Sequence, residues 1–183
     1  MTSVERFLSE VLRLKVNREK SAVDRPWNRK FLGFTFTTHF QPRVKVSPQS
    51  VKRFKDNFRE EFRKGRGRNL GSFIKELAPK HRGWMAYYRI AEVKATFEGL
   101  DSWIRRKLRC ILWRQWKRPK TRRRELIARG LSPEQAQLAA WTGRGPWWSA
   151  GASHMNLAVP IAALSMLGLV SLLDEHLRLK RPL

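Results

Sequence analysis

The chain has 183 residues and is strongly basic, with 39 Lys and Arg against 15 Asp and Glu. The resulting formal charge of +24 predicts phosphate groups as the binding partner. Hydrophobic residues make up 42% of the chain, which is enough to bury a core and excludes a disordered basic tail. A single Cys excludes a disulfide scaffold and a Cys-rich zinc module. We expect a protein without a signal peptide that works in the reducing environment of the cytoplasm.

The first 46 residues have the pattern of a helix followed by a small antiparallel ribbon. Apolar residues recur at helical spacing between positions 4 and 12. Short strand-like runs follow, separated by Asn, Pro and Asp: LRLKV at 12–16, KFLGFTF at 30–36 and RVKV at 43–46. We therefore expect a small α/β unit at this end of a mainly α protein.

From Ser47 onward the sequence pattern becomes helical. Ser47 and Pro48 are a typical N-cap and first helical residue, and Gly65 and Gly67 predict the end of this helix. One stripe of the helix is apolar and is predicted to face the core; it consists of Val51, Phe54, Phe58 and Phe62.

A second helix is predicted to begin near Leu70 and to be interrupted at Pro79. The pattern resumes beyond this proline with Trp84, Tyr87 and Tyr88 on the apolar side. We expect these three rings to pack in the core rather than to stack on bases.

A third, long helix is predicted from residue 96 to residue 118. At 100° per residue, Arg106, Arg109, Trp113 and Lys117 point away from its apolar stripe, so that an exposed Trp lies among three cations. The stripe itself is predicted to be buried and consists of Phe97, Leu100, Ile104, Leu108 and Ile111.

The remaining residues predict short helices that begin after Pro119. ELIARGL at 125–131 and SPEQAQLAAW at 132–141 are helical in pattern, and GRGPWWSAGAS at 143–153 is predicted to be a loop. Polar residues interrupt the apolar stretch at 155–173, so we favour two buried helices over 155–178, broken near Gly168, over a membrane span.

The most basic segment lies at residues 105–124, which contain eleven Lys and Arg and no acid. Solvated helix faces mix both signs of charge, so a run of one sign with interleaved Trp indicates RNA or single-stranded nucleic acid. We predict RNA contacts for Arg105, Arg106, Arg109, Trp113, Arg114, Lys117, Arg118, Lys120, Arg122, Arg123 and Arg124, and on the preceding basic helix for Lys52, Arg53 and Arg59.

Nearly the whole chain carries strings that occur together, and in this order, in one protein family. KVNREKSAV and KFLGFTF precede the Ser-Pro-capped helix, and RGWMAYYRIA, LDSWIRRKLRCILWRQWKRPKTRRREL and GLVSLL follow it. The chain thereby resembles the C-terminal part of group II intron reverse transcriptases, which are the intron-encoded maturases. Strings such as GWMAYYR and WRQWKRPKTRR are unusual, which makes the resemblance specific.

The resemblance implies three regions. Residues 1–46 would be the end of the polymerase palm, residues 47–118 the thumb or maturase-specific domain X, and residues 119–183 a basic, DNA-binding helical region. The fold class expected is therefore mainly α, with a small N-terminal α/β remnant of a polymerase palm, a thumb-like helical bundle and further short helices.

Two strings in the first region are similar to polymerase motifs. NREKS around Lys20 is similar to reverse-transcriptase motif D, although the residues alone favour a surface lysine at this position. From its pattern, FLGF is a half-buried strand in which a glycine admits close backbone approach. Its resemblance to the primer grip implies primer contacts for Phe31, Leu32, Gly33 and Phe34.

The chain departs from the family at the polymerase centre. There, a Tyr-Ala-Asp-Asp turn and an earlier Asp hold two metal ions, and this sequence contains no such turn. Neither Glu60–Glu61 nor Asp174–Glu175 suits a two-metal site, and one Cys with four His cannot supply an endonuclease module. We expect no catalytic residue and no cofactor in this chain, so that Mg²⁺ would belong to the intron RNA or to a palm.

These observations predict an RNA-binding maturase domain that stabilises a group II intron for self-splicing and intron mobility. Its partners would be group II intron RNA and a DNA target, without a membrane. One alternative is a thumb-side fragment of an RNA-directed DNA polymerase that is active only with an upstream palm. Another is a generic basic nucleic-acid-binding protein. The oligomeric state does not follow from the sequence.

Overall fold

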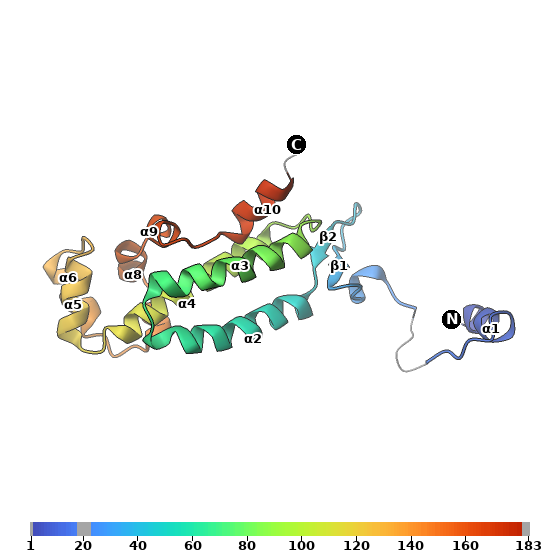
Figure 1. Ribbon diagram of the computed structural model, residues 1–183, viewed down its shortest axis with the longest axis horizontal. Coiled ribbons are helices and arrows are strands. Elements are labelled where there is room, and N and C mark those ends of the chain that lie inside the picture. The colour runs from blue at the N-terminus through green and yellow to red at the C-terminus, as the bar shows by residue number, and fades with distance from the viewer. Residues whose placement is uncertain (1, 18–22, 181–183) are drawn as a thin grey trace.

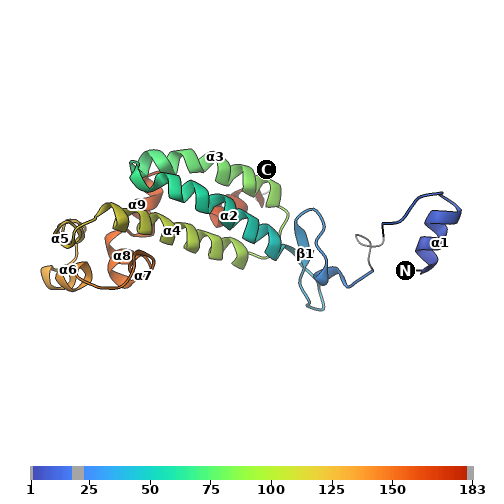
Figure 2. The same cartoon turned by 90° about the horizontal axis from the view of Figure 1, so that it is seen from below.

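The computed structural model describes residues 2–17 and 23–180, and these residues form a mainly helical protein. Ten α-helices and one two-stranded sheet are found in this described part (Figure 1). The predicted fold class, mainly α with a small N-terminal α/β part, is confirmed. Three long helices run side by side, with the short C-terminal helices along one side and around one end (Figure 2).

The N-terminal part contains α1 (Thr2–Glu10), a 3-10 helix (Pro26–Asn28), β1 (Phe34–Phe36) and β2 (Val44–Val46). The two strands pair antiparallel, as predicted for KFLGFTF and RVKV. In both views α1 lies apart from the long helices. The strand predicted at 12–16 is wrong, because these exposed residues pair with no other described strand. Lys20 and its motif lie outside the described residues.

Helix α2 (Pro48–Lys64) follows the predicted signals at both ends. The Ser47 hydroxyl accepts a hydrogen bond from the backbone N–H of Ser50 at 3.2 Å, and Pro48 occupies the first turn, where its missing N–H is not needed. The chain then tightens into a 3-10 helix (Gly65–Gly67). A Cβ atom at Gly65 would lie 2.8 Å from the ring of Phe73, so glycine is required for this close packing.

Helix α3 (Leu70–Tyr88) runs without interruption through Pro79, so the predicted break there is wrong. A proline in a helix interior removes one backbone hydrogen bond. The proline ring is exposed, whereas Leu77, Ala78 and Met85 on either side of it are buried. Burial of these neighbours offsets the missing hydrogen bond and keeps the helix continuous.

Helix α4 (Ala95–Gln115) lies at the centre of the protein, and the whole predicted apolar stripe from Phe97 to Ile111 is buried. The helix ends before the predicted position at Arg118. Trp116 leaves the helical conformation, and Arg118 is extended, as the residue before a proline prefers. Pro119 therefore begins the next helix.

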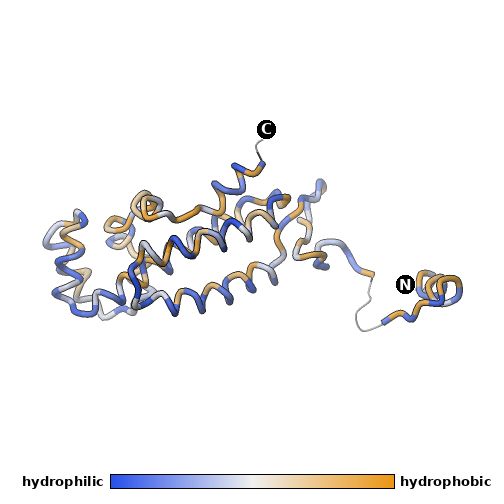
Figure 3. The backbone as a smooth tube through the Cα atoms, in the orientation of Figure 1, coloured by the Kyte–Doolittle hydropathy of each residue, from blue (hydrophilic) through white to orange (hydrophobic). Residues whose placement is uncertain are grey.

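The C-terminal third forms six short helices: α5 (Pro119–Ile127), α6 (Pro133–Ala140), α7 (Pro146–Ser149), α8 (Ser153–Ala158), α9 (Ile161–Met166) and α10 (Leu172–Lys180). The predicted final pair is thus three helices. The break at Gly168, with φ +95°, was predicted, but the break at Pro160 was not. Figure 3 shows that α9 is largely hydrophobic and α5 largely hydrophilic. Among the described helices, none is long and apolar enough to cross a membrane.

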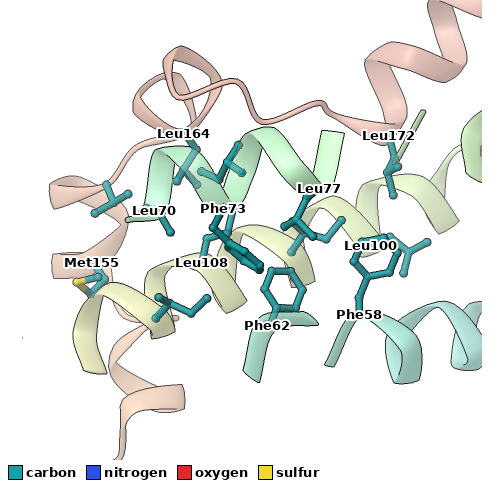
Figure 4. Close-up of a cluster of buried hydrophobic side chains, with 14 of the residues drawn as sticks. Phe58, Phe62, Leu70, Phe73, Leu77, Leu100, Leu108, Met155, Leu164 and Leu172 are labelled. Carbon is teal, nitrogen blue, oxygen red and sulfur yellow. The ribbon is translucent and has the colours of Figure 1, made fainter. Parts of the chain in front are cut away.

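Buried side chains from the first, middle and last parts of the helical region form one cluster. Figure 4 shows side chains of α2, α3 and α4 meeting those of α8, α9 and α10. The core therefore spans the predicted boundary at residues 118 and 119, while the domain limits themselves stay a prediction. The labelled members are Phe58, Phe62, Leu70, Phe73, Leu77, Leu100, Leu108, Met155, Leu164 and Leu172.

A buried carboxylate joins the two ends of this core. Asp101 on α4 accepts hydrogen bonds from the Ser171 hydroxyl at 2.8 Å and from the backbone N–H groups of Leu172 and Leu173 at 2.8 and 3.1 Å. These N–H groups belong to the first turn of α10, where a negative charge is favourable. Asp101 thus fixes α10 against α4.

We expect Leu108→Ala to lower the free energy of unfolding by about 2–5 kcal/mol, because it leaves a cavity in the core around α4. Leu138→Ala on α6 is the matched control, since the Leu138 side chain is 79% exposed. Urea titration followed by circular dichroism measures both changes. Equal midpoints for the two variants would contradict the assignment of Leu108 to the core.

Candidate nucleic-acid interface

A cationic groove lies where the end of α2 and the following 3-10 helix pass α4. Its volume is about 140 Å³, and none of the residues that line it is acidic. Five of the lining side chains are Lys or Arg, and an indole from α7 also lines the groove. The lining residues are Arg59, Phe62, Arg63, Arg66, Lys107, Cys110, Ile111, Arg114 and Trp147.

Helical spacing brings the cations of each wall to the same side. Arg59 and Arg63 are four residues apart on α2, whereas Lys107 and Arg114 are seven apart on α4, so each pair shares one face of its helix. Gln115 fixes the two walls to each other. Its side-chain amide donates hydrogen bonds to the carbonyl oxygens of Arg66 and Arg68 at 3.1 and 2.8 Å.

The charges of the groove are only partly neutralised. Arg59 pairs with Asp56 and Arg63 with Glu60, but no ion pair is found for Arg66, Lys107 or Arg114 among the described residues. Partial burial lowers the pKa of Lys107 below its usual value, and repulsion from nearby arginines adds to this effect, against an opposing influence of Cys110. Such crowding of like charges is relieved when an anion binds.

Aromatic rings support these cations from the protein side. The Lys107 ammonium nitrogen lies 4.8 Å from the ring centroid of Trp147 and 5.5 Å from that of Trp103. Arg106 holds Trp147 in place, since its guanidinium carbon lies 4.2 Å from the centroid. Its Nε and Nη2 donate hydrogen bonds to the Trp147 carbonyl at 3.0 and 2.9 Å. The groove is thus a preformed cationic surface, and its charge is of the sign that attracts phosphate groups.

Residues 51–130 match the family of the group II intron maturase-specific domain. This segment of the chain is therefore similar to a group II intron maturase-specific domain. This match confirms the resemblance found in the sequence, and all five groove cations lie within it, whereas Trp147 lies beyond it. A search of curated proteins found no match to the chain.

Trp113, which was predicted to be exposed on the far side of α4, is instead 1% exposed. Trp113 does lie opposite the apolar stripe of α4, as the helical spacing predicts. The C-terminal helices, however, cover this opposite side of α4 too. The Trp113 ring lies 5.4 Å from the ring of His154, and the Arg122 guanidinium carbon lies 4.7 Å from its centroid. A buried indole has no free face for a base, so Trp113 belongs to the core.

Three of the predicted RNA-binding arginines hold the C-terminal helices in place. Arg109 is 7% exposed and donates from Nε to the Val159 carbonyl at 2.9 Å, so its predicted exposure is also wrong. Burial lowers the pKa of the Arg109 guanidinium. Arg122 donates from Nε to the Trp116 carbonyl at 2.9 Å, and Arg106 is bonded to Trp147.

The other predicted RNA contacts lie on α2, on α4, and at or near α5. Arg114 and Arg59 lie in the groove, and Arg105 is half-buried on α4. Arg124 pairs with Glu125. Their RNA contacts stay a prediction, and the exposed residues of this set outside the groove are Lys52 and Arg53 on α2, and Lys117, Arg118, Lys120, Arg123 and Arg124 at or near α5.

Sequence reasoning missed four lining residues of the groove: Arg63, Arg66, Lys107 and Trp147. Arg63 lies four residues beyond Arg59 on α2, so helical spacing could have found it, whereas Arg66 lies in the 3-10 helix beyond the end of α2. Trp147 had no such signal, because its position depends on the fold of residues far along the chain.

The FLGF string forms a tight turn rather than the predicted half-buried strand. Phe31 and Phe34 exchange backbone hydrogen bonds at 3.0 and 2.8 Å, and Leu32 and Gly33 have positive φ angles of 48° and 83°. Phe31 and Leu32 are exposed, and only Phe34 enters β1. The predicted close backbone approach is confirmed, since a Cβ atom at Gly33 would lie 2.5 Å from the Tyr88 hydroxyl oxygen.

This turn lies beside a second cavity of about 430 Å³ between α2 and α3. Lys30 and Arg53 line it together with several aromatic rings. Tyr88 and Trp84 pack inward as predicted, but Tyr87 is 54% exposed and donates from its hydroxyl to the Leu32 carbonyl at 2.8 Å. The core position predicted for Tyr87 is therefore wrong, because this residue supports the turn.

We expect Arg109→Ala to lower the free energy of unfolding by about 1.5–3 kcal/mol, because the buried Val159 carbonyl loses a charged hydrogen-bond donor. Arg114→Ala removes the same side chain from an exposed position of the same helix and should change stability by at most about 0.5 kcal/mol. Urea denaturation compares the variants. If both unfold like the parent, Arg109 is not a structural residue.

Proposed function

We propose that the chain is an RNA-binding maturase domain that stabilises the folded form of a group II intron during self-splicing. The observation that carries this proposal is the acid-free groove of five cations within the matched maturase-specific domain. Intron RNA is a polyanion whose phosphates such a groove attracts. We place this activity in the cytoplasm, where the single, buried Cys110 would remain reduced.

The protein would act by binding the active RNA fold more tightly than the alternatives. Intron helices that approach one another bring their phosphates together, and the cations of the groove reduce this repulsion. A ligand that prefers one conformation raises the population of that conformation, without forming or breaking any bond itself. The splicing chemistry would belong to the RNA and its metal ions.

The alternative is a thumb-side part of an RNA-directed DNA polymerase, which would also serve intron mobility on a DNA target. It is favoured by the cavity between α2 and α3, where the exposed FLGF turn lies next to Lys30 and Arg53. Within residues 2–17 and 23–180, no group of His, Cys, Asp or Glu is suited to a metal ion, so the described part does not fit a pair of Mg²⁺ ions.

We expect the double variant Arg66→Glu/Arg114→Glu to lose RNA affinity at least tenfold, because two groove cations become anions. The slope of log K against log salt should also become shallower, by roughly 0.7–0.9 for each phosphate that the variant no longer neutralises. Filter binding or fluorescence anisotropy at several salt concentrations measures both effects.

Lys75→Glu provides a control for this experiment. Lys75 is exposed on α3, and its side chain lies near Gly168 rather than in the groove. The control is therefore the double variant Lys75→Glu/Arg89→Glu, in which Arg89 is another exposed residue outside the groove. It changes the net charge by the same amount as Arg66→Glu/Arg114→Glu. Equal losses for both double variants would mean that net charge alone, and not the groove, attracts RNA.

We expect the chain to increase the rate of group II intron splicing at low magnesium, because groove cations replace ions that otherwise neutralise the RNA phosphates. At high magnesium the RNA folds without help, and the difference should shrink. Gel analysis of splicing with and without the chain measures the rates. Equal rates at low magnesium, for an intron RNA that the chain binds, would contradict the maturase function.

A further inference from the structure

The C-terminal helices line a further pocket, which is distinct from the groove and from the cavity between α2 and α3 and lies beyond the matched segment. Its volume is about 340 Å³, within the range of small-ligand sites, and α6, α7 and α8 contribute to its wall. It is lined by Leu131, Gln135, Leu138, Ala139, Thr142, Trp148, Ser153, His154 and Leu157.

The wall combines apolar and polar groups and has no acid. Leucine side chains form most of its apolar part, and the indole of Trp148 forms an aromatic side. The amide of Gln135 and the hydroxyl groups of Thr142 and Ser153 are hydrogen-bonding groups of the wall. The guanidinium carbon of Arg144 lies 4.2 Å from the ring centroid of Trp148, so a positive charge lies next to this indole.

Consecutive tryptophans connect this pocket to the cationic groove. Trp147 lines the groove and Trp148 lines the pocket, although both belong to the four-residue helix α7. Neighbouring residues on a helix point about 100° apart, which lets the two indoles face different sites. A strand whose phosphates lie in the groove therefore has an aromatic pocket next to it.

We propose that this pocket binds an unpaired nucleobase of the RNA whose phosphates occupy the groove. The inference rests on the proposed RNA-binding function and adds a preference for single-stranded nucleotides. Unpaired bases stack on Trp rings and guanidinium planes and present polar edges to side chains. A purely apolar protein helix offers no hydrogen-bond partner to the Gln135 amide, whereas a base edge can bond it.

The experiment compares a short single-stranded RNA that contains 2-aminopurine with a blunt duplex of equal length. Trp148→Leu keeps an apolar side chain but removes the aromatic face, so we expect affinity for the single strand to fall roughly tenfold or more while affinity for the duplex stays unchanged. Trp148→Phe keeps a ring and should restore much of the loss. Stacking should quench the 2-aminopurine fluorescence with the parent and with Trp148→Phe, but less with Trp148→Leu.

Trp141→Leu is the matched control, because Trp141 is exposed at the end of α6 and does not line the pocket. It should bind both RNAs like the parent. Equal losses for Trp148→Leu on strand and duplex, or no loss on either, would overturn the base pocket while leaving the groove proposal intact. A parent chain that binds neither RNA would overturn both. A change in sedimentation with Trp148→Leu would instead assign the pocket to a second copy of the chain.

Discussion

Burial of α4 on two sides is the constraint on which the rest of the structure depends. On one side its apolar stripe packs with α2 and α3, and on the other side the C-terminal helices cover Trp113 and Arg109. A helix between two layers must satisfy every polar group that it buries. Arg109 and Asp101 meet this condition by bonding directly to the backbone of the covering segments.

This arrangement divides the basic residues into two roles. Arg106, Arg109 and Arg122 each donate to a backbone carbonyl and thereby hold the C-terminal helices. Other cations of α4 lie on the side that the C-terminal helices do not cover. There, Lys107 and Arg114 line the groove together with Arg66. Some of the basic residues therefore stabilise the fold, whereas others keep their charge available to an anionic partner, and composition alone does not separate the two groups.

Sequence patterns predicted the local elements better than the long-range contacts. Caps and apolar stripes gave α2 and the buried face of α4 correctly, because these depend on neighbouring residues. The predicted exposure of Trp113 was wrong, because the helices that cover it begin beyond residue 118. The periodicity of α4 carries no information about those helices. Of the groove cations only Arg59 and Arg114 were predicted to contact RNA, whereas Trp147 and the Trp148 pocket depend on how a four-residue helix docks against α4.

The central claim is that RNA binds across the groove between α2 and α4 rather than along the basic residues of α5. Ultraviolet crosslinking of the chain to bound intron RNA, followed by mass spectrometry of the crosslinked peptides, tests it most directly. We expect crosslinks in peptides that contain residues 59–66 and 107–114, with a further crosslink at the α7 tryptophans. Crosslinks confined to residues 117–127 would contradict it.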